Sequence, residues 1–539
     1  MKSNARAGPW GPGAPPMRYE THFGDRVVRC YTDRPPSVYA MFLEAVGRNP
    51  TGDALVCGDR RLTWAALEGL VARRASALAR RGIVSGDRVA LLLHNGLELP
   101  MTLLALARLG AIGVPLSDRS KASELRYILN HCEAVTLLFE PSLESEVPVD
   151  DDVPTLRLRL PADRWQAEVR ETGEPAIPPA LVEEDDVALI MYTSGTTGHP
   201  KGAMVTHLNL VHVALQYEYC MGLTMSDRSI VAVPMSHITG IAAHLATVVR
   251  CASTLIVIDT FKAAAFLALA ARERMTHTVL VPAMYTLCLL DPHCATCDLS
   301  AWRVGGYGGA PMPSATIAAL GQRLPRLSLM NCYGSTETVA PVAMMPPGET
   351  AQHADRVGRA IPGSEFIVVD DDGCQVAPGT PGELWMSGPT LVRGYWKNPE
   401  ATRASFTSGF WHSGDVGSMT AEGLIGVHDR KKDMINRGGY KVFAIEVENV
   451  ICAHPAVVEA AIVAKPCPVL GERVHAFVTP RAGTASPELL SELQAFCAER
   501  LSDYKVPESF TLLAEPLPRN INGKVLKRAL RERLNDQTP

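Results

Sequence analysis

The sequence predicts an α/β protein: a large N-terminal domain of two α/β units and a small β-rich unit, followed by a small α+β C-terminal domain. Two observations favour this fold class. Apolar residues at helical spacing alternate with short apolar strands, and such strand–helix repeats indicate parallel sheets covered by helices. The chain has 539 residues, more than one ordinary core accommodates.

The first α/β unit begins near residue 36. Its order is helix, strand, helix, strand, helix, strand, at 62–81, 87–93, 99–109, 111–115, 123–131 and 134–139. The second unit follows with strands at 187–195, 229–234, 254–259, 276–282 and 327–335. Because residues 1–35 begin with a Pro- and Gly-rich stretch, we expect them to form a flexible tail.

Beyond residue 358 the pattern changes. Short strands at 365–371 and 382–388 lie between Gly- and Pro-rich turns, which predicts a β-rich subdomain over about 358–429. A charged run, DRKKD, marks the boundary, so we expect an N-terminal domain at 36–429 and a C-terminal domain at 430–539. The C-terminal domain contains strands at 460–466 and 472–480, a helix at 489–500 and a basic helical tail.

The composition excludes several classes of protein. Hydrophobic residues make up 47% and charged residues 20%, as in globular proteins, and the net charge of -5 gives no support for nucleic-acid binding. No uninterrupted apolar run reaches the roughly 18 residues of a membrane span, and no signal peptide is visible. We therefore expect a cytoplasmic protein, either a monomer or a homodimer.

The cysteines do not indicate a disulfide framework. There are 13, without the dense spacing of small secreted domains. Cys294 and Cys297 form a C-x-x-C pair, but a structural zinc site would require a second pair. We interpret them as two free thiols, with a redox pair as the alternative.

The segment TSGTTGHPKG (193–202) follows an apolar strand and is predicted to bind phosphate. Glycines bring backbone N–H groups close to phosphate oxygens, hydroxyls add donors, and the lysine adds positive charge. It is not a Walker P-loop, because His-Pro separates its last turn glycine from the lysine. The predicted binding residues are Thr193, Ser194, Gly195, Thr196, Thr197, Gly198 and Lys201.

Five further motifs occur in a fixed order along the chain. They are GGAP (308–311), NCYGSTET (331–338), WHSGDVG (411–417), DRKKDMINRGG (429–439) and PRNINGKVLK (518–527). Together with the loop they resemble the adenylate-forming (AMP-binding) superfamily over about residues 36–535, closest in pattern to free-standing acyl-CoA synthetases. The resemblance implies ATP, Mg²⁺ and coenzyme A as cofactors and co-substrates, and a mobile C-terminal domain.

The resemblance also implies roles for residues at the nucleotide. Tyr333 would pack on adenine beside the wall formed by Gly309 and Ala310, Thr336 would contact the α-phosphate, and Glu337 would bind magnesium. A cation there offsets the charge that develops on the α-phosphorus.

Residues further along the chain would complete the nucleotide site. By the same resemblance, Asp415 would hold the ribose hydroxyls with help from Arg430. A carboxylate suits a vicinal diol because it accepts two hydrogen bonds. Lys432 would be the hinge between two domain orientations, and Gly439 would line a channel for the thiol.

The C-terminal motif supplies the catalytic lysine of the family, which falls on Lys524. An ammonium that bridges carboxylate and phosphate can align the attack and offset charge. Lys527 is the alternative, but its spacing from the Asn-Gly turn does not match.

The segment VPMSHITG (233–240) matches the border of the family's acyl pocket, with His237 beside the carboxylate. Amino-acid-activating relatives have an aspartate at the next position, where this chain has Ile238. The pocket therefore lacks a countercharge for an α-amino group. We expect an aryl or alkyl acid, and the sequence does not choose between them.

The predicted reaction is ATP-dependent formation of an acyl-adenylate and transfer of the acyl group to coenzyme A, as in a fatty or aryl acid–CoA ligase. Coenzyme A is favoured as acceptor because no carrier or condensation domain is fused after Lys524. Two alternatives stay open. One is a stand-alone enzyme that loads a separate carrier protein, and the other is a non-catalytic nucleotide-binding scaffold.

Overall fold

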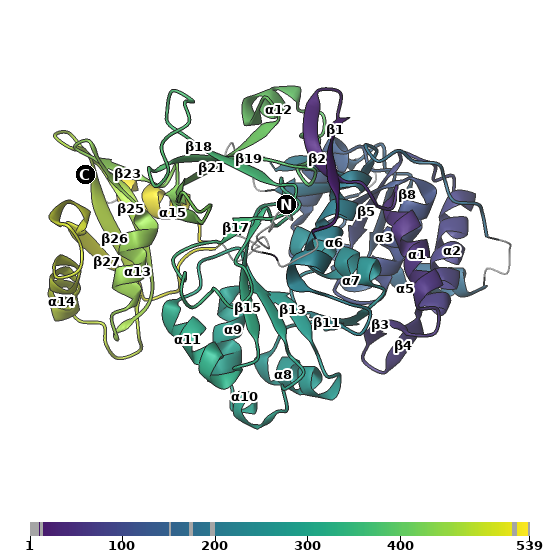
Figure 1. Ribbon diagram of the computed structural model, residues 1–539, viewed down its shortest axis with the longest axis horizontal. Helices are drawn as coiled ribbons and strands as arrows, with labels where there is room; N and C mark the ends of the chain where they lie inside the picture. Colours follow the sequence, from purple (N-terminus) through teal and green to yellow (C-terminus); the bar gives the residue numbers. More distant parts are fainter. Residues whose placement is uncertain are drawn as a thin grey trace, which may run out of the picture. The chain divides into compact units, whose positions relative to one another are not determined.

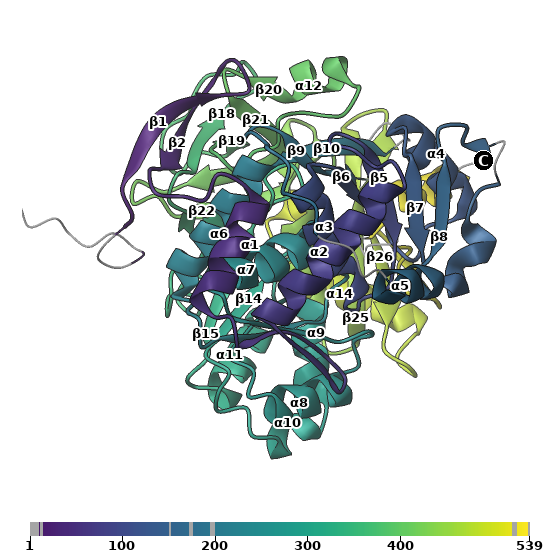
Figure 2. The ribbon, with the colours of Figure 1, turned by 90° about the vertical axis from the view of Figure 1, so that its right-hand side faces the viewer.

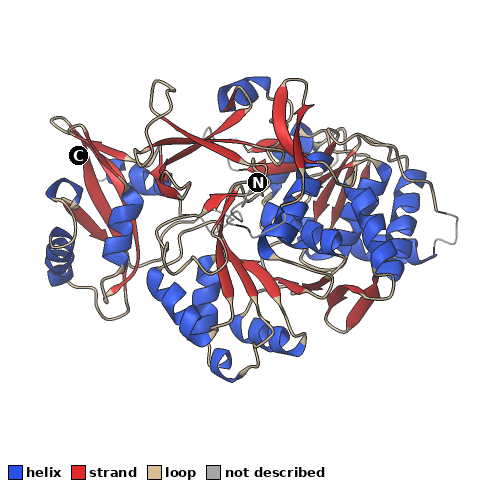
Figure 3. Ribbon diagram, viewed as in Figure 1, coloured by secondary structure: helices blue, strands red, loops and turns tan. Residues whose placement is uncertain are grey.

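The computed structural model describes residues 10, 14–149, 152–171, 176–193, 200–519 and 525–536. The chain forms two compact units. Unit 1 comprises residues 1–366 and 386–411, and unit 2 comprises residues 367–385 and 412–539. Figure 1 labels many of their helices and strands, and Figure 3 shows the helices and strands of the chain in different colours.

A six-stranded sheet forms the first α/β part of unit 1. The strand order is β10-β9-β6-β5-β7-β8, parallel except for the antiparallel pair β9–β10. Its strands are β5 (Arg88–Leu92), β6 (Ile112–Pro115), β7 (Thr136–Phe139), β8 (Leu158–Pro161), β9 (Val187–Thr193) and β10 (Lys201–Thr206).

A nine-stranded sheet forms the second part, with the order β17-β16-β15-β14-β13-β11-β12-β3-β4. The strands from β15 to β3 run parallel, and both edges are antiparallel. The strands are β3 (Asp53–Cys57), β4 (Arg60–Thr63), β11 (Arg228–Val231), β12 (Thr254–Val257), β13 (His277–Leu280), β14 (Val304–Tyr307), β15 (Ser328–Tyr333), β16 (Ala343–Met344) and β17 (Arg359–Ala360).

One layer of helices is shared by the two sheets. Alternate residues of a strand point to opposite faces. Leu55 of β3 and Val89 of β5 therefore belong to one common apolar cluster, while their neighbours Val56 and Ala90 belong to two different outer clusters. The common cluster includes residues of α1 (Val38–Arg48), α2 (Trp64–Arg80), α3 (Glu98–Leu109), α6 (His207–Met221), the π-helix η3 (Gly240–Ala246) and α7 (Thr247–Cys251).

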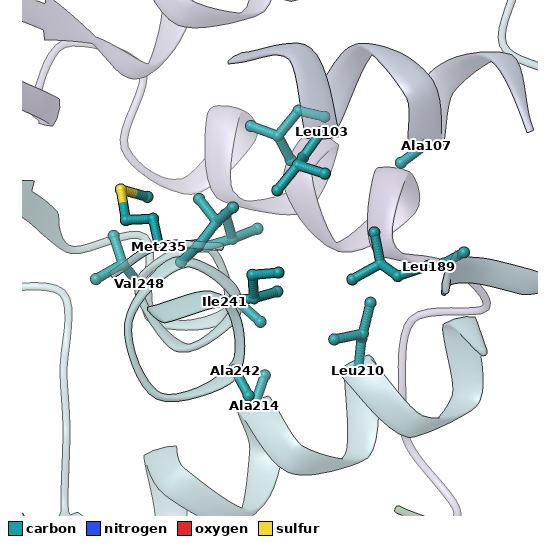
Figure 4. Packing of buried hydrophobic residues seen from close by; sticks show 14 of the residues in the cluster. Leu103, Ala107, Leu189, Leu210, Ala214, Met235, Ile241, Ala242 and Val248 are labelled. Atoms are coloured by element: carbon teal, nitrogen blue, oxygen red, sulfur yellow. The ribbon is translucent and has the colours of Figure 1, made fainter. Parts of the chain in front are cut away.

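Figure 4 shows this shared layer from close by, with Leu103, Leu189, Leu210 and Ile241 converging from four elements. The outer faces of the sheets are covered by further helices. These are α4 (Ala122–His131), η1 (Pro141–Glu146), α8 (Ala263–Arg272), α9 (Pro282–Leu290), α10 (His293–Thr296) and α11 (Ser314–Arg323), with α5 (Ala162–Glu171) beside α2.

The N-terminal region differs from the expected flexible tail. Residues 17–31 form an antiparallel hairpin of β1 (Met17–His22) and β2 (Arg26–Tyr31), drawn in purple in Figure 2. Its inner residues are buried, including Arg26, whose guanidinium donates to the carbonyl oxygens of Val392 and Arg393 at 2.7 and 2.8 Å. The Pro- and Gly-rich composition is confined to the preceding residues, and the strands alternate too weakly in hydropathy to stand out.

A five-stranded sheet contains the predicted β-rich region. Its order is β18-β19-β21-β20, with β22 on β21. The strands are β18 (Glu365–Val369), β19 (Gly382–Ser387), β20 (Phe406–Thr407), β21 (Phe410–Met419) and β22 (Ile425–Arg430), and α12 (Pro399–Ser405) precedes β20. The unit boundary falls within β18, β19 and β21.

The rest of unit 2 has its own core. The sheet order is β24-β23-β26-β25, with β27 parallel to β26. Ile462 faces a cluster with α13 and α14, whereas its neighbours Ala461 and Val463 face α15. The elements are β23 (Ile435–Arg437), β24 (Tyr440–Val442), α13 (Ala444–Cys452), β25 (Val457–Cys467), β26 (Gly471–Pro480), α14 (Pro487–Ala498), η4 (Asp503–Lys505), β27 (Ser509–Leu512) and α15 (Lys527–Asp536).

The predicted fold class, α/β with a large N-terminal part and a small C-terminal part, is confirmed. Strands expected at 87–93 and 134–139 are β5 and β7, and the helix expected at 62–81 is α2. In the part of the chain that the structure describes, no helix has the length and apolar character that crossing a membrane requires.

Candidate active site

The two ends of the predicted phosphate loop lie next to each other. Thr193 is the last residue of β9 and Lys201 the first of β10, and the two are directly paired across the antiparallel strands. Ser194, Gly195, Thr196, Thr197 and Gly198 lie outside the described residues. Thr193 and Lys201 therefore form the base of a hairpin, with the hydroxyl of Thr193 on one strand and the ammonium of Lys201 on the other.

Glycine is required immediately after this lysine. A Cβ on Gly202 would lie 2.7 Å from Cγ2 of Ile190 and 3.2 Å from Cζ of Tyr192. The backbone carbonyl of Gly202 also accepts a hydrogen bond from the N–H of Trp396 at 2.7 Å. The segment around residue 395 is thereby fixed alongside β10.

The carboxylate of Glu337 lies at this base. Its Oε1 accepts a hydrogen bond from the hydroxyl of Thr193 at 3.5 Å and from the hydroxyl of Tyr395 at 3.1 Å. The ammonium of Lys201 lies 5.0 Å from the centre of the Tyr395 ring, a cation–π contact. Four side chains from β9, β10 and two later loops therefore gather at one place.

Tyr395 is a site residue that sequence reasoning misses. Its side chain is 6% exposed, and burial, followed by the charge of Glu337, raises its pKa above the ordinary range. The hydroxyl therefore stays protonated and donates. Nothing in the local sequence marks this residue, because the contact depends on how the segment after residue 392 runs beside β10.

The turn after β15 contains Thr336 and Glu337, and its backbone is strained at the two residues Val339 and Ala340. Val339 and Ala340 have φ angles of 53° and 33°, a left-handed region that residues other than glycine rarely adopt. The hydroxyl of Thr338 accepts from the N–H of Ser335 at 2.8 Å and donates to its carbonyl at 3.1 Å. These bonds fix the direction in which the two motif residues leave the strand.

The ends of β14 and β15 lie side by side, since Tyr307 pairs with Asn331 in parallel register. A Cβ on Gly308 would lie 2.5 Å from the carbonyl oxygen of Cys332, so only glycine allows this approach. Gly309 has a φ of 79° and is exposed together with Ala310. Ligands of open α/β sheets bind at such carboxyl ends of parallel strands, where half-buried Tyr333 also lies.

The segment that contains His237 follows β11 in the same sheet. His237 is half-buried, and its backbone N–H donates to the carbonyl of Pro234 at 3.2 Å. Ile238 is 7% exposed and belongs to the common apolar cluster. A Cβ on Gly240 would lie 2.5 Å from Cα of Met235, which explains glycine at the start of η3.

In unit 2, Asp415 and Arg430 form an ion pair. They are directly opposite each other on β21 and β22, with Oδ1 of Asp415 2.7 Å from Nε of Arg430. The backbone N–H of Asp415 donates to the Ser413 hydroxyl at 2.9 Å, and Arg430 donates to the Ser413 carbonyl at 3.2 Å. The carboxylate, 7% exposed as a residue, is thus held in one orientation.

The predicted hinge follows directly. Asp429 is 2% exposed, and burial raises its pKa to about 6, although it accepts hydrogen bonds from the N–H groups of Arg430 and Ala444. Lys432 is exposed, and its carbonyl accepts a bond from Arg531. The predicted hinge therefore consists of the buried carboxyl group of Asp429 followed by the exposed side chain of Lys432.

Gly439 lies in a turn of exposed backbone. Gly438 and Gly439 have φ angles of 60° and 92°, which other residues adopt at a cost. The N–H of Gly439 donates to the side-chain oxygen of Asn436 at 3.1 Å, and that of Gly438 to the carbonyl of Leu470 at 2.8 Å.

Lys524 lies outside the described residues. The alternative, Lys527, forms an ion pair with Glu448, with Nζ 2.7 Å from Oε1 and both side chains largely buried. Cys294 is buried, Cys297 is half-buried, and both are free thiols.

Two family profiles match the chain. The profile of the AMP-binding enzyme family matches residues 42–396, and that of the AMP-binding enzyme C-terminal domain matches residues 446–524. The chain belongs to the AMP-binding enzyme family, and the resemblance seen in its motifs is confirmed.

Relatives match over nearly the whole chain. Indoleacetate–CoA ligase from Aromatoleum aromaticum is 33% identical over 495 residues, 90% of this chain and 96% of the relative. Long-chain-fatty-acid–CoA ligase FadD13 from Mycobacterium tuberculosis is 32% identical over 487 residues, 89% and 95%. The solved structure of O-succinylbenzoate coenzyme A synthetase from Bacillus subtilis with ATP and magnesium is 28% identical, with a TM-score of 0.82 over 92% of this chain and 99% of that one.

Proposed function

We propose that the protein activates a carboxylic acid with ATP, forming an acyl-adenylate and pyrophosphate, and then transfers the acyl group to coenzyme A. The observation that supports this most directly is the gathering of Thr193, Lys201, Glu337 and Tyr395 at the base of the phosphate loop. A hydroxyl, an ammonium and a carboxylate in one place suit a metal-bound polyphosphate.

Glu337 is the residue that would hold Mg²⁺. Its Oε1 accepts from two neutral hydroxyls, which orient the carboxylate and contribute no positive charge. A hard oxygen ligand of this kind is what Mg²⁺ prefers, and the metal would neutralise charge on the phosphates. Lys201 and the loop would hold the departing pyrophosphate, and Thr336 would donate to the α-phosphate.

Two sets of motif residues suit a nucleoside. Tyr333, Gly309 and Ala310 lie at the carboxyl ends of β14 and β15, where a flat ring fits against exposed backbone. The carboxylate of Asp415, oriented by Arg430, suits the two ribose hydroxyls.

Lys524 would align the substrate carboxylate with the α-phosphate in the first step. Lys432 would be the hinge about which the C-terminal region reorients, and Gly439 would then line the path of the thiol. The ion pair of Lys527 with Glu448 supports Lys524 over Lys527, because an ammonium in a largely buried pair is already engaged.

The substrate would be a carboxylic acid without an α-amino group. Ile238 lies in the common apolar cluster, where an α-ammonium would have no countercharge from that position. His237 would lie near the carboxylate. Relatives named for indoleacetate and long-chain fatty acids support an aryl or alkyl acid.

The test of the mechanism separates its two half-reactions. In Lys524→Ala we expect acyl-adenylate formation, measured as pyrophosphate release, to fall by about 100-fold or more. Thiolysis of a supplied acyl-adenylate should change little. Lys527→Ala is the matched control and should retain adenylation. Equal loss of both half-reactions in Lys524→Ala, or loss of adenylation in Lys527→Ala instead, would contradict the assignment.

The acceptor is tested with a panel of aryl, alkyl and amino acids, each with and without coenzyme A. We expect pyrophosphate release with aryl or alkyl acids, and consumption of the coenzyme A thiol at the same rate. Pyrophosphate release without thiol consumption would favour a carrier protein as acceptor. No release with any acid would favour a nucleotide-binding scaffold.

A further inference from the structure

The N-terminal hairpin places three side chains of types that can bind a metal ion on one face. Arg18 is paired with Cys30, and His22 with Arg26, across β1 and β2. Side chains at every second position share a face, so Glu20 and His22 on β1 lie on the same side as Cys30 on β2. Figure 2 shows this hairpin, labelled β1 and β2. One oxygen, one nitrogen and one sulfur donor are thus brought together.

The donor atoms are close and shielded from water. A carboxylate oxygen of Glu20, a ring nitrogen of His22 and the sulfur of Cys30 all lie within 4.8 Å of one another. Cys30 is 0% and His22 is 8% exposed. Ligands of a tetrahedral zinc site are about 3.3–3.8 Å apart. Side-chain adjustments of about 1 Å would therefore close the set around one ion.

The nitrogen that faces the other donors is Nε2 of His22. Nδ1 lies 2.7 Å from Oδ1 of Asp185, whose other oxygen accepts from the N–H of Phe23 at 2.9 Å. Such a carboxylate fixes the proton on Nδ1 and leaves the lone pair on Nε2 for a metal. Among the described residues, Nε2 is buried and has no hydrogen-bond partner.

A carboxylate faces this nitrogen without a hydrogen bond between them. Oε2 of Glu20 lies 3.4 Å from Nε2 of His22. Two lone pairs at this distance require a positive charge, either a proton on His22 or a metal ion between the two atoms. Arg34 donates to both oxygens of Glu20, at 3.0 and 2.6 Å, as hydrogen-bonding groups do to metal-ligating carboxylates.

The surrounding charge suits a divalent cation. The acidic groups of the cluster are Glu20, Glu184, Asp185 and, when ionised, the thiol of Cys30, and its guanidinium groups are those of Arg18 and Arg34. Four negative and two positive groups leave a net charge that one divalent ion balances. A coordinated thiol is deprotonated by the metal itself.

We propose that Glu20, His22 and Cys30 form a Zn²⁺ site in the N-terminal hairpin, separate from the proposed nucleotide site. The donor set of thiolate, imidazole and carboxylate is one that zinc accepts, with the fourth position left to water. Asp185 orients His22 and lies two residues before β9, so the metal would fasten the hairpin to the strand that ends at Thr193.

The rival explanation is that His22 is an imidazolium between the two carboxylates. It predicts no thiolate and no affinity for transition metals. In the proposed site the sulfur of Cys30 is a metal-bound thiolate, and in the rival explanation it is not. The test therefore measures bonding to this sulfur directly.

Metal-free full-length protein, prepared by chelation, is titrated with Co²⁺ as a spectroscopic substitute for Zn²⁺. We expect the near-ultraviolet charge-transfer absorption of a cobalt–thiolate bond, saturating with the chain and displaced by Zn²⁺. Zn²⁺ should also raise the midpoint of thermal unfolding by about 2 °C or more. Absence of the thiolate band in the wild-type protein overturns the proposal.

Variants locate the site. Cys30→Ser should abolish the band, and His22→Gln should weaken cobalt binding by about tenfold or more. Cys132→Ser is the matched control, since Cys132 is also 0% exposed and burial raises the pKa of both thiols to about 12. The control should keep the band. A band that persists in Cys30→Ser, or is lost equally in Cys132→Ser, also overturns the site.

Discussion

Glu337 is oriented by a side chain that lies 58 residues further along the chain. The hydroxyl of Tyr395 and that of Thr193 donate to the same carboxylate oxygen. Thr193 precedes Glu337 in the sequence, and Tyr395 follows it. Because Thr193 would also face the phosphates, Tyr395 is the group whose main effect is on the position of Glu337. It is therefore a positioning residue for the proposed metal site.

Tyr395→Phe removes this hydrogen bond and keeps the ring beneath Lys201. We expect apparent affinity for Mg²⁺ in pyrophosphate release to fall by about tenfold, within the range seen when groups that orient a metal ligand are removed. The measurement is initial rate against Mg²⁺ concentration at saturating ATP. A positioning role requires that excess Mg²⁺ restores most of the rate.

Tyr31→Phe is the matched control. Its hydroxyl is also buried and, in the described part of the chain, has no hydrogen-bond partner, so its removal should leave the Mg²⁺ dependence unchanged. An unchanged Mg²⁺ dependence in Tyr395→Phe would show that Thr193 alone fixes Glu337.

Functional residues can be predicted from the sequence when they belong to a recognisable local motif. Asp415 and Arg430 are examples, because each stands in a recognisable run and the structure pairs them across two strands. Tyr395 and Asp185 are not found this way. Their importance comes from contacts between distant segments, with 58 residues separating Tyr395 from Glu337 and 163 separating Asp185 from His22. No local pattern records such a contact.

At the scale of elements, the spacing between β14 and β15 decides how the motifs that follow them lie. Gly308 stands where β14 ends, with its missing Cβ directed at the Cys332 carbonyl. The two strands could not approach this closely with any other residue. Tyr333 at the end of β15 and Ala310 after β14 therefore depend on one glycine.

Gly308→Ala places a methyl group 2.5 Å from backbone, so the strand ends must separate. We expect a loss of stability of about 1–3 kcal/mol, as for overpacked cores, and a rise in the KM for ATP. Urea denaturation and pyrophosphate-release kinetics measure the two effects. Gly321→Ala in α11 is the control, since a Cβ there meets nothing within 4 Å and alanine favours helix.

A stability loss in Gly308→Ala with an unchanged KM for ATP would separate this turn from nucleotide binding. Equal effects in both glycine variants would show that the close approach has no consequence.

Helices and strands were predictable where the apolar residues of a segment recur at the spacing of a helix or a strand. The helix α2 buries one face against the core, and the strands β5 and β7 bury both faces. This burial requires apolar residues at the matching positions, and their spacing is the pattern from which the elements are predicted. The strands β1 and β2 have only 6 residues each, β1 buries only His22, and the buried residues of the hairpin include the polar side chains of His22 and Arg26. Its stability comes from distant partners such as Val392, which the segment itself does not reveal.

At the scale of the whole molecule, the histidines His207, His212, His244 and His277 of unit 1 are buried in neutral form. Burial lowers the pKa to about 4 for His207 and His244 and to about 3 for His212 and His277. Hydrogen bonds fix two of them on one serine, with Nδ1 of His244 and of His277 each 3.0 Å from the hydroxyl of Ser229. Protonation would place a charge inside the shared core.

The sign of the pH dependence follows from these pKa values. An unfolded histidine has a pKa of about 6.5, so below that pH the unfolded chain binds protons that the native state excludes. Stability is therefore fully present above about pH 6.5 and is lost as the pH falls toward 4. At pH values well below 6.5, each histidine lowers the free energy of unfolding by about 1.4 kcal/mol for every unit by which the pH falls.

We therefore expect the free energy of unfolding of unit 1 to fall steeply between pH 6 and pH 4.5, measured by urea denaturation at a series of pH values. His277→Gln removes one titrating group, so its slope should be shallower by about 1.4 kcal/mol per pH unit, whatever the substitution costs at pH 8. His293→Gln is the control, because the side chain of His293 is 54% exposed. If the His277→Gln slope equals that of the wild-type protein, His277 is already protonated in the native core, and the Ser229 network must accommodate that charge.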